Sequence, residues 1–118
     1  MNSILLSKGK KIYFTSDHHF GAPTKEASKP REKKFVKWLD HIKKDAQVLF
    51  ILGDLFDFWF EYKYAAPKGF TRVIGKLAEL SDEGIDIHFF VGNHDMWMRG
   101  YLEQEVNMKI YYLSLIHI

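Results

Sequence analysis

Hydrophobic and polar positions follow two periods along the chain, one typical of strands and one typical of helices. Residues 46–52 are apolar apart from Gln47, as in a strand that is covered on both faces. Within 31–44, Phe35, Trp38 and Ile42 recur at helical spacing, and lysines fill many of the other positions. The same patterns predict strands at 11–16, 46–52, 85–91 and 108–113, and helices at 31–44, 71–83 and about 98–106.

The order of these predicted elements indicates an α/β fold with a parallel sheet, built from β-α-β-α-β units. We expect residues 21–30, which contain Gly and Pro, to form a loop, with Pro30 suited to the first turn of the following helix. Parallel strands joined by right-handed crossovers bring their carboxyl ends together, and ligands bind at those ends. With 118 residues, of which 47% are hydrophobic, residues 1–118 are predicted to form a single domain.

Composition limits the classes of partner and site. The 17 basic and 15 acidic residues give a net charge of +2, which is too small to argue for nucleic acid, and no nucleic-acid partner is expected. The absence of cysteine excludes disulfides and thiolate ligands, so any metal must be held by oxygen and nitrogen atoms. Asp54 and Asp57 interrupt the longest apolar run, and lysines follow the apolar start, so we expect a cytoplasmic chain.

Three predicted strand ends carry the chemically distinctive residues. They read "SDHHFG", "LGDLFD" and "VGNHDM", and each supplies Asp, Asn or His where packing would favour apolar side chains. In an extended segment Asp17 and His19 point to the same side, whereas His18 points away. Each motif alone is common in turns and helix caps, but the three together predict a centre for divalent metal ions.

The same motifs resemble the opening motifs of the calcineurin-like metallophosphoesterase superfamily: Asp17-x-His19, Gly53-Asp54-x-x-Asp57 and Gly92-Asn93-His94-Asp95. More narrowly, the stretches "SDHHFGAP", "GDLFDFWFEYKYAAPKGF" and "GNHDMWM" resemble UDP-2,3-diacylglucosamine pyrophosphohydrolases of the lipid A pathway, in the form found in Bacteroidetes-type bacteria. The resemblance extends from Tyr13 to about Tyr112. It implies the N-terminal half of a four-layer α/β/β/α sandwich.

The resemblance assigns four metal ligands. It implies that Asp17 and His19 hold a first ion, that Asp54 bridges two ions, and that Asn93 holds the second. The implied metals are two Mn²⁺ ions, which activate water and neutralise charge on phosphate oxygens, so that no protein nucleophile is needed. Asp57 is expected beside the ligands rather than among them.

The resemblance also implies the reaction. Water would attack the α-phosphate of UDP-2,3-diacylglucosamine, releasing UMP and 2,3-diacylglucosamine 1-phosphate (lipid X). His94 would stabilise or protonate oxygens at the reacting phosphate, and Asp95 would fix the tautomer of His94. An enzyme with this substrate is expected in peripheral contact with the cytoplasmic face of the inner membrane. No oligomeric state is predicted.

The stretch 49–64 places two aspartates and a glutamate among aromatic rings. We expect its carboxylates to bind metal and its rings to lie beside the site, where a diacylated substrate needs apolar surface. For each ring the alternative is a place in the core. The candidate substrate contacts are Phe58, Trp59, Tyr62 and Trp97 for the lipid, and Lys68 and Arg72 for diphosphate or uridine.

The chain departs from the family pattern in two places. His94 stands where some of these enzymes carry Arg, so the substrate assignment depends on the flanking aromatic sequence. The family supplies further metal-binding histidines from its second half, and His117 in the apolar tail does not match them. We therefore expect a C-terminally truncated domain of weak or no activity, with 113–118 foreign to the gene. The alternatives are another metallophosphoesterase that acts on a soluble phosphoester, and a non-catalytic remnant that binds a partner.

Overall fold

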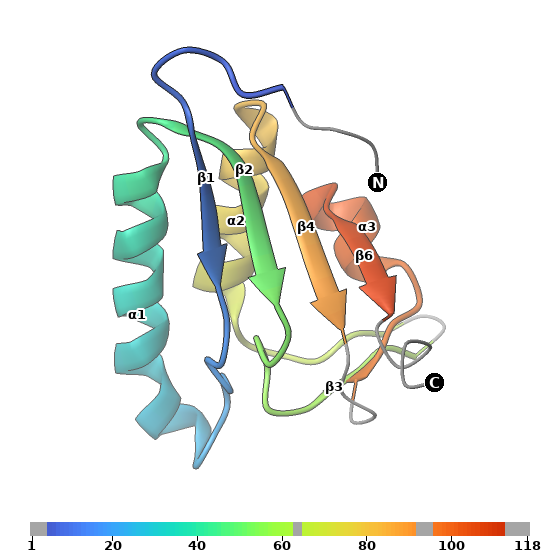
Figure 1. Ribbon diagram of the computed structural model, residues 1–118. Helices are drawn as coiled ribbons and strands as arrows, with labels where there is room; N and C mark the ends of the chain where they lie inside the picture. Colours follow the sequence, from blue (N-terminus) through green and yellow to red (C-terminus); the bar gives the residue numbers. More distant parts are fainter. Residues whose placement is uncertain (1–4, 63–64, 92–95, 113–118) are drawn as a thin grey trace, which may run out of the picture.

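The computed structural model describes residues 5–62, 65–91 and 96–112, with Met96 and Trp97 described by their backbone alone (Figure 1). The strands are β1 (Lys11–Thr15), β2 (Ala46–Leu52), β3 (Trp59–Phe60), β4 (Asp86–Val91), β5 (Met96–Trp97) and β6 (Lys109–Tyr112). The helices are α1 (Lys25–Ile42), α2 (Thr71–Asp82) and α3 (Tyr101–Val106). The predicted alternation of strands and helices is confirmed.

A parallel sheet with the strand order β1-β2-β4-β6 forms the centre of the fold. Along the chain, each new strand is added at the same edge of the sheet, next to the strand that was added before it. Right-handed crossovers therefore place all three helices on one face of the sheet (Figure 1). The carboxyl ends of the strands consequently lie together, as predicted, at the lower end of the sheet in Figure 1.

The core lies between this face of the sheet and the helices. Leu49 and Ile51 of β2 alternate toward it and are fully buried, as is Phe89 of β4. Leu39 of α1 and Leu77 of α2 are also fully buried, because they lie on the apolar faces of the two helices. None of the helices in the described ranges is long and apolar enough to cross a membrane.

Helix α1 begins earlier than predicted, because residues 25–30 are helical rather than part of a loop. Thr24 is the N-cap residue, and its hydroxyl accepts a hydrogen bond of 3.1 Å from the Ala27 N–H. Pro30 lies inside the helix rather than in its first turn, where its missing N–H costs one intrahelical hydrogen bond. The earlier start brings Lys25, Ser28 and the following turn next to the loop that carries His19.

Two short strands were not predicted. Strands β3 and β5 pair in parallel as a separate small sheet, with Trp59 opposite Met96 and Phe60 opposite Trp97 in the backbone register. Segments of two residues are too short to show the alternation that identifies a strand in a sequence. This pairing joins the aromatic stretch after β2 to the segment after β4.

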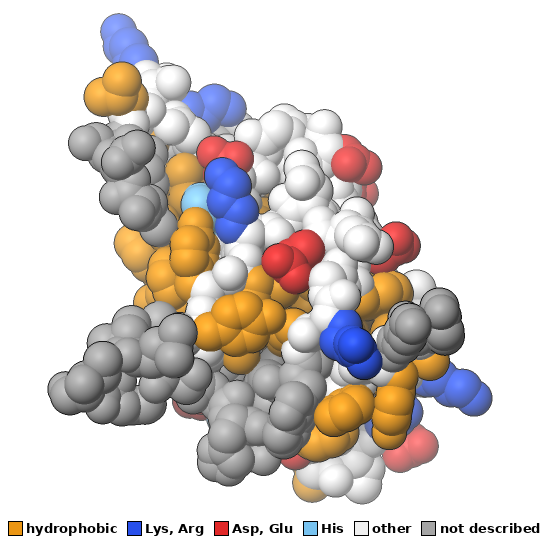
Figure 2. All heavy atoms as spheres, turned by 90° about the vertical axis from the view of Figure 1, so that its right-hand side faces the viewer, with side chains coloured by type: hydrophobic (Ala, Val, Ile, Leu, Met, Phe, Trp, Pro, Cys, Tyr) orange, Lys and Arg blue, Asp and Glu red, His pale blue; other side chains and the backbone are white. Residues whose placement is uncertain are grey.

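The sheet face opposite the helices carries a row of rings. Phe14, Phe50 and His88 lie on neighbouring strands in register, and each neighbouring pair of rings stacks at a centroid distance of 5.1 Å. Phe14 is 60% exposed and Leu52 is 46% exposed, because no helix in the described ranges covers this face. Hydrophobic side chains accordingly gather along the left-hand side of Figure 2. The two further layers of the expected sandwich are not among the described residues.

The burial of His88 predicts a pH-dependent stability. Burial lowers the pKa of His88 below its ordinary value of 6.5, so the unfolded chain binds this proton more readily than the folded chain. Its contribution to the free energy of unfolding is therefore complete above about pH 6.5 and is lost as the pH falls, by at most about 1.4 kcal/mol per pH unit. Urea unfolding at several pH values between 5 and 7.5 should show this loss reduced in His88→Phe. The exposed residue His41 supplies the control His41→Phe, and an equal loss in both variants would contradict the explanation.

Candidate metal centre and adjoining pocket

The loops that follow β1 and β2 are held together by backbone hydrogen bonds. The N–H groups of His18 and His19 both donate to the carbonyl oxygen of Asp54, each at 2.8 Å. Farther along, the Phe20 N–H donates to the Leu55 carbonyl at 3.0 Å, and Phe20 and Phe56 form an isolated parallel bridge. The pairing of the two strands thus continues beyond their ends and fixes the relative position of the two loops.

The backbone of these loops is left-handed at the residues that carry the candidate ligands. The φ angles of Asp17, His19 and Asp54 are 65°, 49° and 52°. Gly53, which directly precedes Asp54, has a φ angle of 82°. The expectation of an extended Asp-x-His segment is therefore wrong, although its consequence holds because the two side chains do meet. Non-glycine residues in this conformation cost about 1–2 kcal/mol each, and such strain often marks functional sites.

Asp17, His19 and Asp54 form a cluster in which one ligand atom from each residue lies within 4.8 Å of the others. Nε2 of His19 is 3.0 Å from Oδ1 of Asp17 and 3.9 Å from Oδ2 of Asp54. Nδ1 of the same ring is 3.5 Å from Oδ1 of Asp57. We call Asp17, His19 and Asp54 the acidic cluster. Asp57 contacts the histidine from its other side.

The acidic cluster has the chemistry of a divalent-metal site. Carboxylate oxygens and an imidazole nitrogen are ligands that such ions accept in the absence of thiolates. Two carboxylates this close repel each other, and a bound cation would offset that repulsion. The Asp17 side chain is 77% exposed, which leaves the cluster open to substrate and water. Asn93, His94 and Asp95, the other predicted site residues, lie outside the described residues.

Helix α1 supports the loop that carries His19. The Gly21 N–H donates to the Ser28 hydroxyl at 2.8 Å, and that hydroxyl donates to the buried Glu32 carboxylate at 2.6 Å. The Arg31 guanidinium donates to the carbonyl oxygens of His18 and Ala22. These contacts hold the loop against α1. They could not be predicted from the sequence, where residues 25–30 indicate a loop.

His18 is turned away from the acidic cluster, as predicted. Its Nε2 lies 2.6 Å from the Thr15 hydroxyl, and its ring packs on Phe20 and Phe35 at centroid distances of 5.1 and 4.5 Å. Burial lowers the pKa of His18 below its ordinary value. The His18 ring therefore packs with the neighbouring rings, away from the acidic cluster, and is not a candidate ligand.

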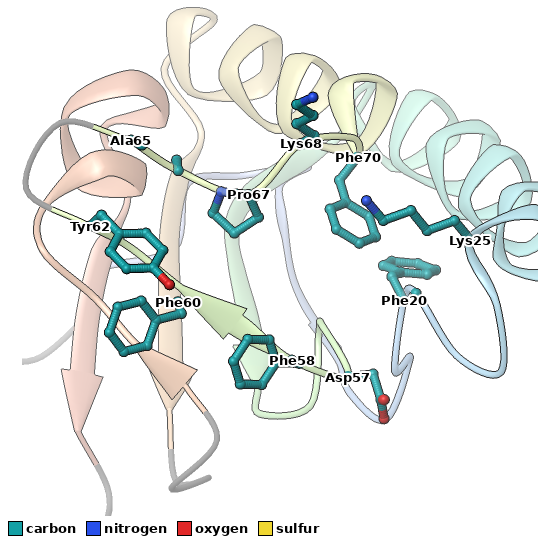
Figure 3. A pocket seen from close by; sticks show the side chains of 12 residues that line it. Phe20, Lys25, Asp57, Phe58, Phe60, Tyr62, Ala65, Pro67, Lys68 and Phe70 are labelled. Atoms are coloured by element: carbon teal, nitrogen blue, oxygen red, sulfur yellow. The ribbon is translucent and has the colours of Figure 1, made fainter.

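An apolar pocket of about 470 Å³ lies next to the acidic cluster (Figure 3). Asp57 lines one end of the pocket and also faces His19, so the two features are contiguous. Phe20 and Phe70 lie on the same side of the pocket as Asp57, with Lys25 extending toward them from α1, and Phe60 and Tyr62 lie at the opposite end. The other residues that line the pocket include Phe58, Pro67 and Lys68, and we call this space the apolar pocket.

Only some of the predicted substrate contacts line the apolar pocket. Phe58, Tyr62 and Lys68 line the apolar pocket, whereas Arg72 is exposed on α2 and does not line it. Trp59 requires a correction, because its side chain is fully buried among the core residues. The side chain of Trp97 is outside the described part. Sequence reasoning missed Phe20, Lys25, Pro67 and Phe70, although Phe20 directly follows the Asp-x-His motif.

Glu61 also requires a correction, because this carboxylate of the aromatic stretch is not at the acidic cluster. Its side chain is 1% exposed, and Oε2 accepts a hydrogen bond of 2.7 Å from the Trp59 indole. Oε1 accepts from the backbone N–H groups of Arg99 at 2.5 Å and Tyr101 at 3.0 Å. Glu61 therefore ties β3 to the start of α3.

The chain is similar to one protein family and to several curated proteins. The calcineurin-like phosphoesterase family model matches residues 10–116. A UDP-2,3-diacylglucosamine hydrolase of Porphyromonas gingivalis is 48% identical over 101 residues, which cover 86% of this chain and 38% of the relative. Proteins of the same name are 34% identical over 85 residues in Actinobacillus succinogenes and 32% identical over 83 residues in Nitrosococcus oceani.

The matches to the latter two relatives cover 72% and 70% of this chain, and 34% and 31% of the relatives. The chain therefore spans less than half the length of these curated relatives. The family match includes both loops of the acidic cluster and the whole parallel sheet. This chain belongs to the calcineurin-like phosphoesterase family.

Proposed function

We propose that this chain contributes to a metal-dependent hydrolase that cleaves the pyrophosphate bond of UDP-2,3-diacylglucosamine. The products would be UMP and 2,3-diacylglucosamine 1-phosphate. The proposal rests chiefly on the contact between the acidic cluster and the apolar pocket, through Asp57. A phosphate group at the cluster would then lie beside a surface suited to acyl chains. The substrate in the names of the relatives supports the same choice.

Asp17, His19 and Asp54 would hold the metal, and we propose Asn93 as a further ligand. We propose two Mn²⁺ ions, the pair implied by the family. Bound ions of this kind supply positive charge that activates water and stabilises the phosphate oxygens during in-line attack. The cluster offers the required oxygen and nitrogen donors without cysteine.

The residues around the cluster would orient the ligands. Oδ1 of Asp57 lies 3.5 Å from Nδ1 of His19 and would favour the tautomer that leaves Nε2 to face the metal. We propose that His94 donates a hydrogen bond or a proton to an oxygen of the reacting phosphate, with Asp95 fixing its tautomer. Arg31 and Ser28 would act at a distance, by keeping the His19 loop against α1.

The apolar pocket would receive part of the diacylated sugar. Phe58 and Tyr62 are 57% and 66% exposed, so their rings are available to a lipid that partitions from a membrane surface. Lys68 and Lys25 at the pocket rim would face phosphate oxygens. We propose peripheral contact with the cytoplasmic face of the inner membrane, where the diacylated substrate would be embedded.

Replacement of Phe58 should separate lipid recognition from phosphate chemistry. Phe58→Ala is expected to raise KM for detergent-dispersed UDP-2,3-diacylglucosamine about tenfold, because burying such a ring contributes about 1.5–3 kcal/mol. Hydrolysis of a soluble aryl phosphate should change less than twofold. Leu6→Ala removes an exposed apolar side chain outside the pocket and serves as the control. Equal loss with both substrates would contradict a lipid-binding role for Phe58.

Substrate preference tests the proposed function and its alternatives. The protein, including any continuation of the reading frame beyond Ile118, should release UMP from UDP-2,3-diacylglucosamine with Mn²⁺ present. The rate should exceed that for aryl phosphates, and a chelator should abolish it. Efficient hydrolysis of the aryl phosphate alone would favour a phosphoesterase with a soluble substrate. Absence of hydrolysis together with absence of stoichiometric metal binding would favour a non-catalytic binding protein.

We also propose that residues of the longer relatives beyond the matched region complete the metal site. The 118-residue chain alone should then bind Mn²⁺ weakly and aggregate through its exposed apolar sheet face. Sequencing the source locus beyond the codon for Leu113 checks this. A native gene that encodes Ile118 followed by a stop codon would contradict it.

A further inference from the structure

A second cavity, of about 370 Å³, shares Phe20 with the apolar pocket. The loop after β1 forms one wall with Asp17 and His18. Helix α1 forms the other wall with Arg31, Lys34, Phe35 and Trp38. We call this space the cationic cavity. It adjoins the acidic cluster, because Asp17 belongs to both.

Aromatic rings form the apolar part of the cationic cavity. Phe35 and Trp38 stack at a centroid distance of 5.9 Å, and the His18 ring lies 4.5 Å from Phe35. Phe35 is almost fully buried, whereas Trp38 and His18 are partly exposed. Trp38 is also held by an edge contact with Tyr13 at 6.1 Å. A fixed, partly exposed aromatic face of this kind is suited to stacking with a planar base.

Two cations line the same cavity. The Arg31 guanidinium is fixed by its hydrogen bonds to the carbonyl oxygens of His18 and Ala22. Lys34 is exposed, and its ammonium group pairs with no carboxylate in the described part of the chain. The cavity is lined by two basic side chains, Arg31 and Lys34, and by one carboxylate, Asp17. A bound metal would offset the negative charge of Asp17. The cavity therefore favours an anion that carries a planar ring.

The two cavities differ in chemistry and flank the same loop. Phe20 lines both of them, the apolar pocket reaches the acidic cluster through Asp57, and the cationic cavity reaches it through Asp17. A molecule that spans the cluster would place one end in each cavity. The apolar end of such a molecule matches the apolar pocket, and an anionic end with a base matches the cationic cavity.

We propose that the cationic cavity binds the nucleoside monophosphate half of a pyrophosphate-linked substrate, with the base on Trp38 and the phosphate near Arg31 and Lys34. This inference rests on the proposed function for the identity of the nucleotide. It orients the substrate: the nucleotide lies against α1, and the acylated sugar lies toward the stretch 57–70. UMP, the nucleotide product, should therefore compete with the substrate by occupying the cationic cavity beside α1.

Charge reversal at Lys34 tests the inference with a matched control on the same helix. Lys34→Glu should weaken UMP binding, measured by titration calorimetry, at least tenfold, and should raise KM with kcat changed less than about twofold. Lys33→Glu makes the same charge change at an exposed residue that does not line the cavity, and should alter UMP binding less than twofold. Both residues are exposed, so neither variant should disturb folding.

Trp38→Leu supplies an independent test of base stacking. It should weaken binding of both UMP and uridine, whereas Lys34→Glu should weaken UMP and leave uridine unchanged. Equal effects of the two lysine variants, or UMP binding that neither Lys34→Glu nor Trp38→Leu alters, would overturn the inference. If the substrate is hydrolysed in that case, the proposed function still stands. If no hydrolysis occurs but UMP binding depends on Lys34, the cavity assignment stands and the proposed function fails.

Discussion

Asp54→Asn is expected to lower kcat/KM at least about 10³-fold, which corresponds to about 4 kcal/mol of transition-state stabilisation. The substitution removes the charged oxygen that we assign to the metal. The local backbone should persist, because Asn tolerates the left-handed conformation observed at Asp54, with φ of 52°. The hydrogen bonds from His18 and His19 should also persist, because they use the backbone carbonyl of Asp54. Asp17→Asn should cause a similar loss for the same reason.

Stability of the metal-free chain distinguishes a lost ligand from a damaged fold. Asp17 and Asp54 are close enough to repel each other, so Asp54→Asn should leave the melting temperature in chelator unchanged or raise it. Asp82→Asn, at the exposed end of α2, is the control and should change neither activity nor melting temperature. Activity of Asp54→Asn within tenfold of the wild type would contradict the assignment of this residue to the metal.

Glu61→Ala is expected to cause the largest loss of stability among the polar substitutions, about 3 kcal/mol in the free energy of unfolding. It removes the acceptor for the Trp59 indole and for the N–H groups of Arg99 and Tyr101. A buried donor left without an acceptor costs about 1–3 kcal/mol. In a chain of this size the melting temperature should fall by about 10 °C.

Glu61→Gln separates the hydrogen bonds from the volume of the side chain. The amide keeps one acceptor oxygen and replaces the other with a donor, so the loss should be intermediate, about 1–2 kcal/mol. Glu105→Ala, at an exposed residue of α3, is the control and should change stability by less than about 0.5 kcal/mol. Urea unfolding measures all three variants. A loss below 0.5 kcal/mol for Glu61→Ala would show that these contacts contribute little.

The elements with a long apolar pattern could be predicted from the sequence. The predicted strand at 46–52 coincides with β2, and the helix predicted at 71–83 differs from α2 by one residue. The start of α1 could not be predicted in the same way, because 25–30 has no apolar stripe and contains Pro30. The helix starts after its N-cap residue, Thr24. The sequence alone does not distinguish such a cap from an ordinary turn.

The acidic cluster was predictable because its residues directly follow strands whose ends must meet in a parallel sheet. Its local conformation was not, since left-handed backbone at Asp17 and His19 depends on the pairing of two loops. The aromatic stretch was harder, because composition does not distinguish Trp59 in the core from Phe58 in the pocket. The role of Glu61 depends on Arg99 and Tyr101, which are distant in the sequence.

The most direct test of the metal centre is a titration of the protein, including any continuation of its reading frame, with Mn²⁺. The electron paramagnetic resonance signal of the free ion measures the binding. We expect saturable loss of that signal in the wild-type chain and in Asp82→Asn. Asp17→Asn and Asp54→Asn should weaken the binding at least tenfold, because each removes a charged ligand from the cluster. Binding that both variants retain within twofold of the wild type, or no saturable binding at all, would contradict a metal centre at Asp17, His19 and Asp54.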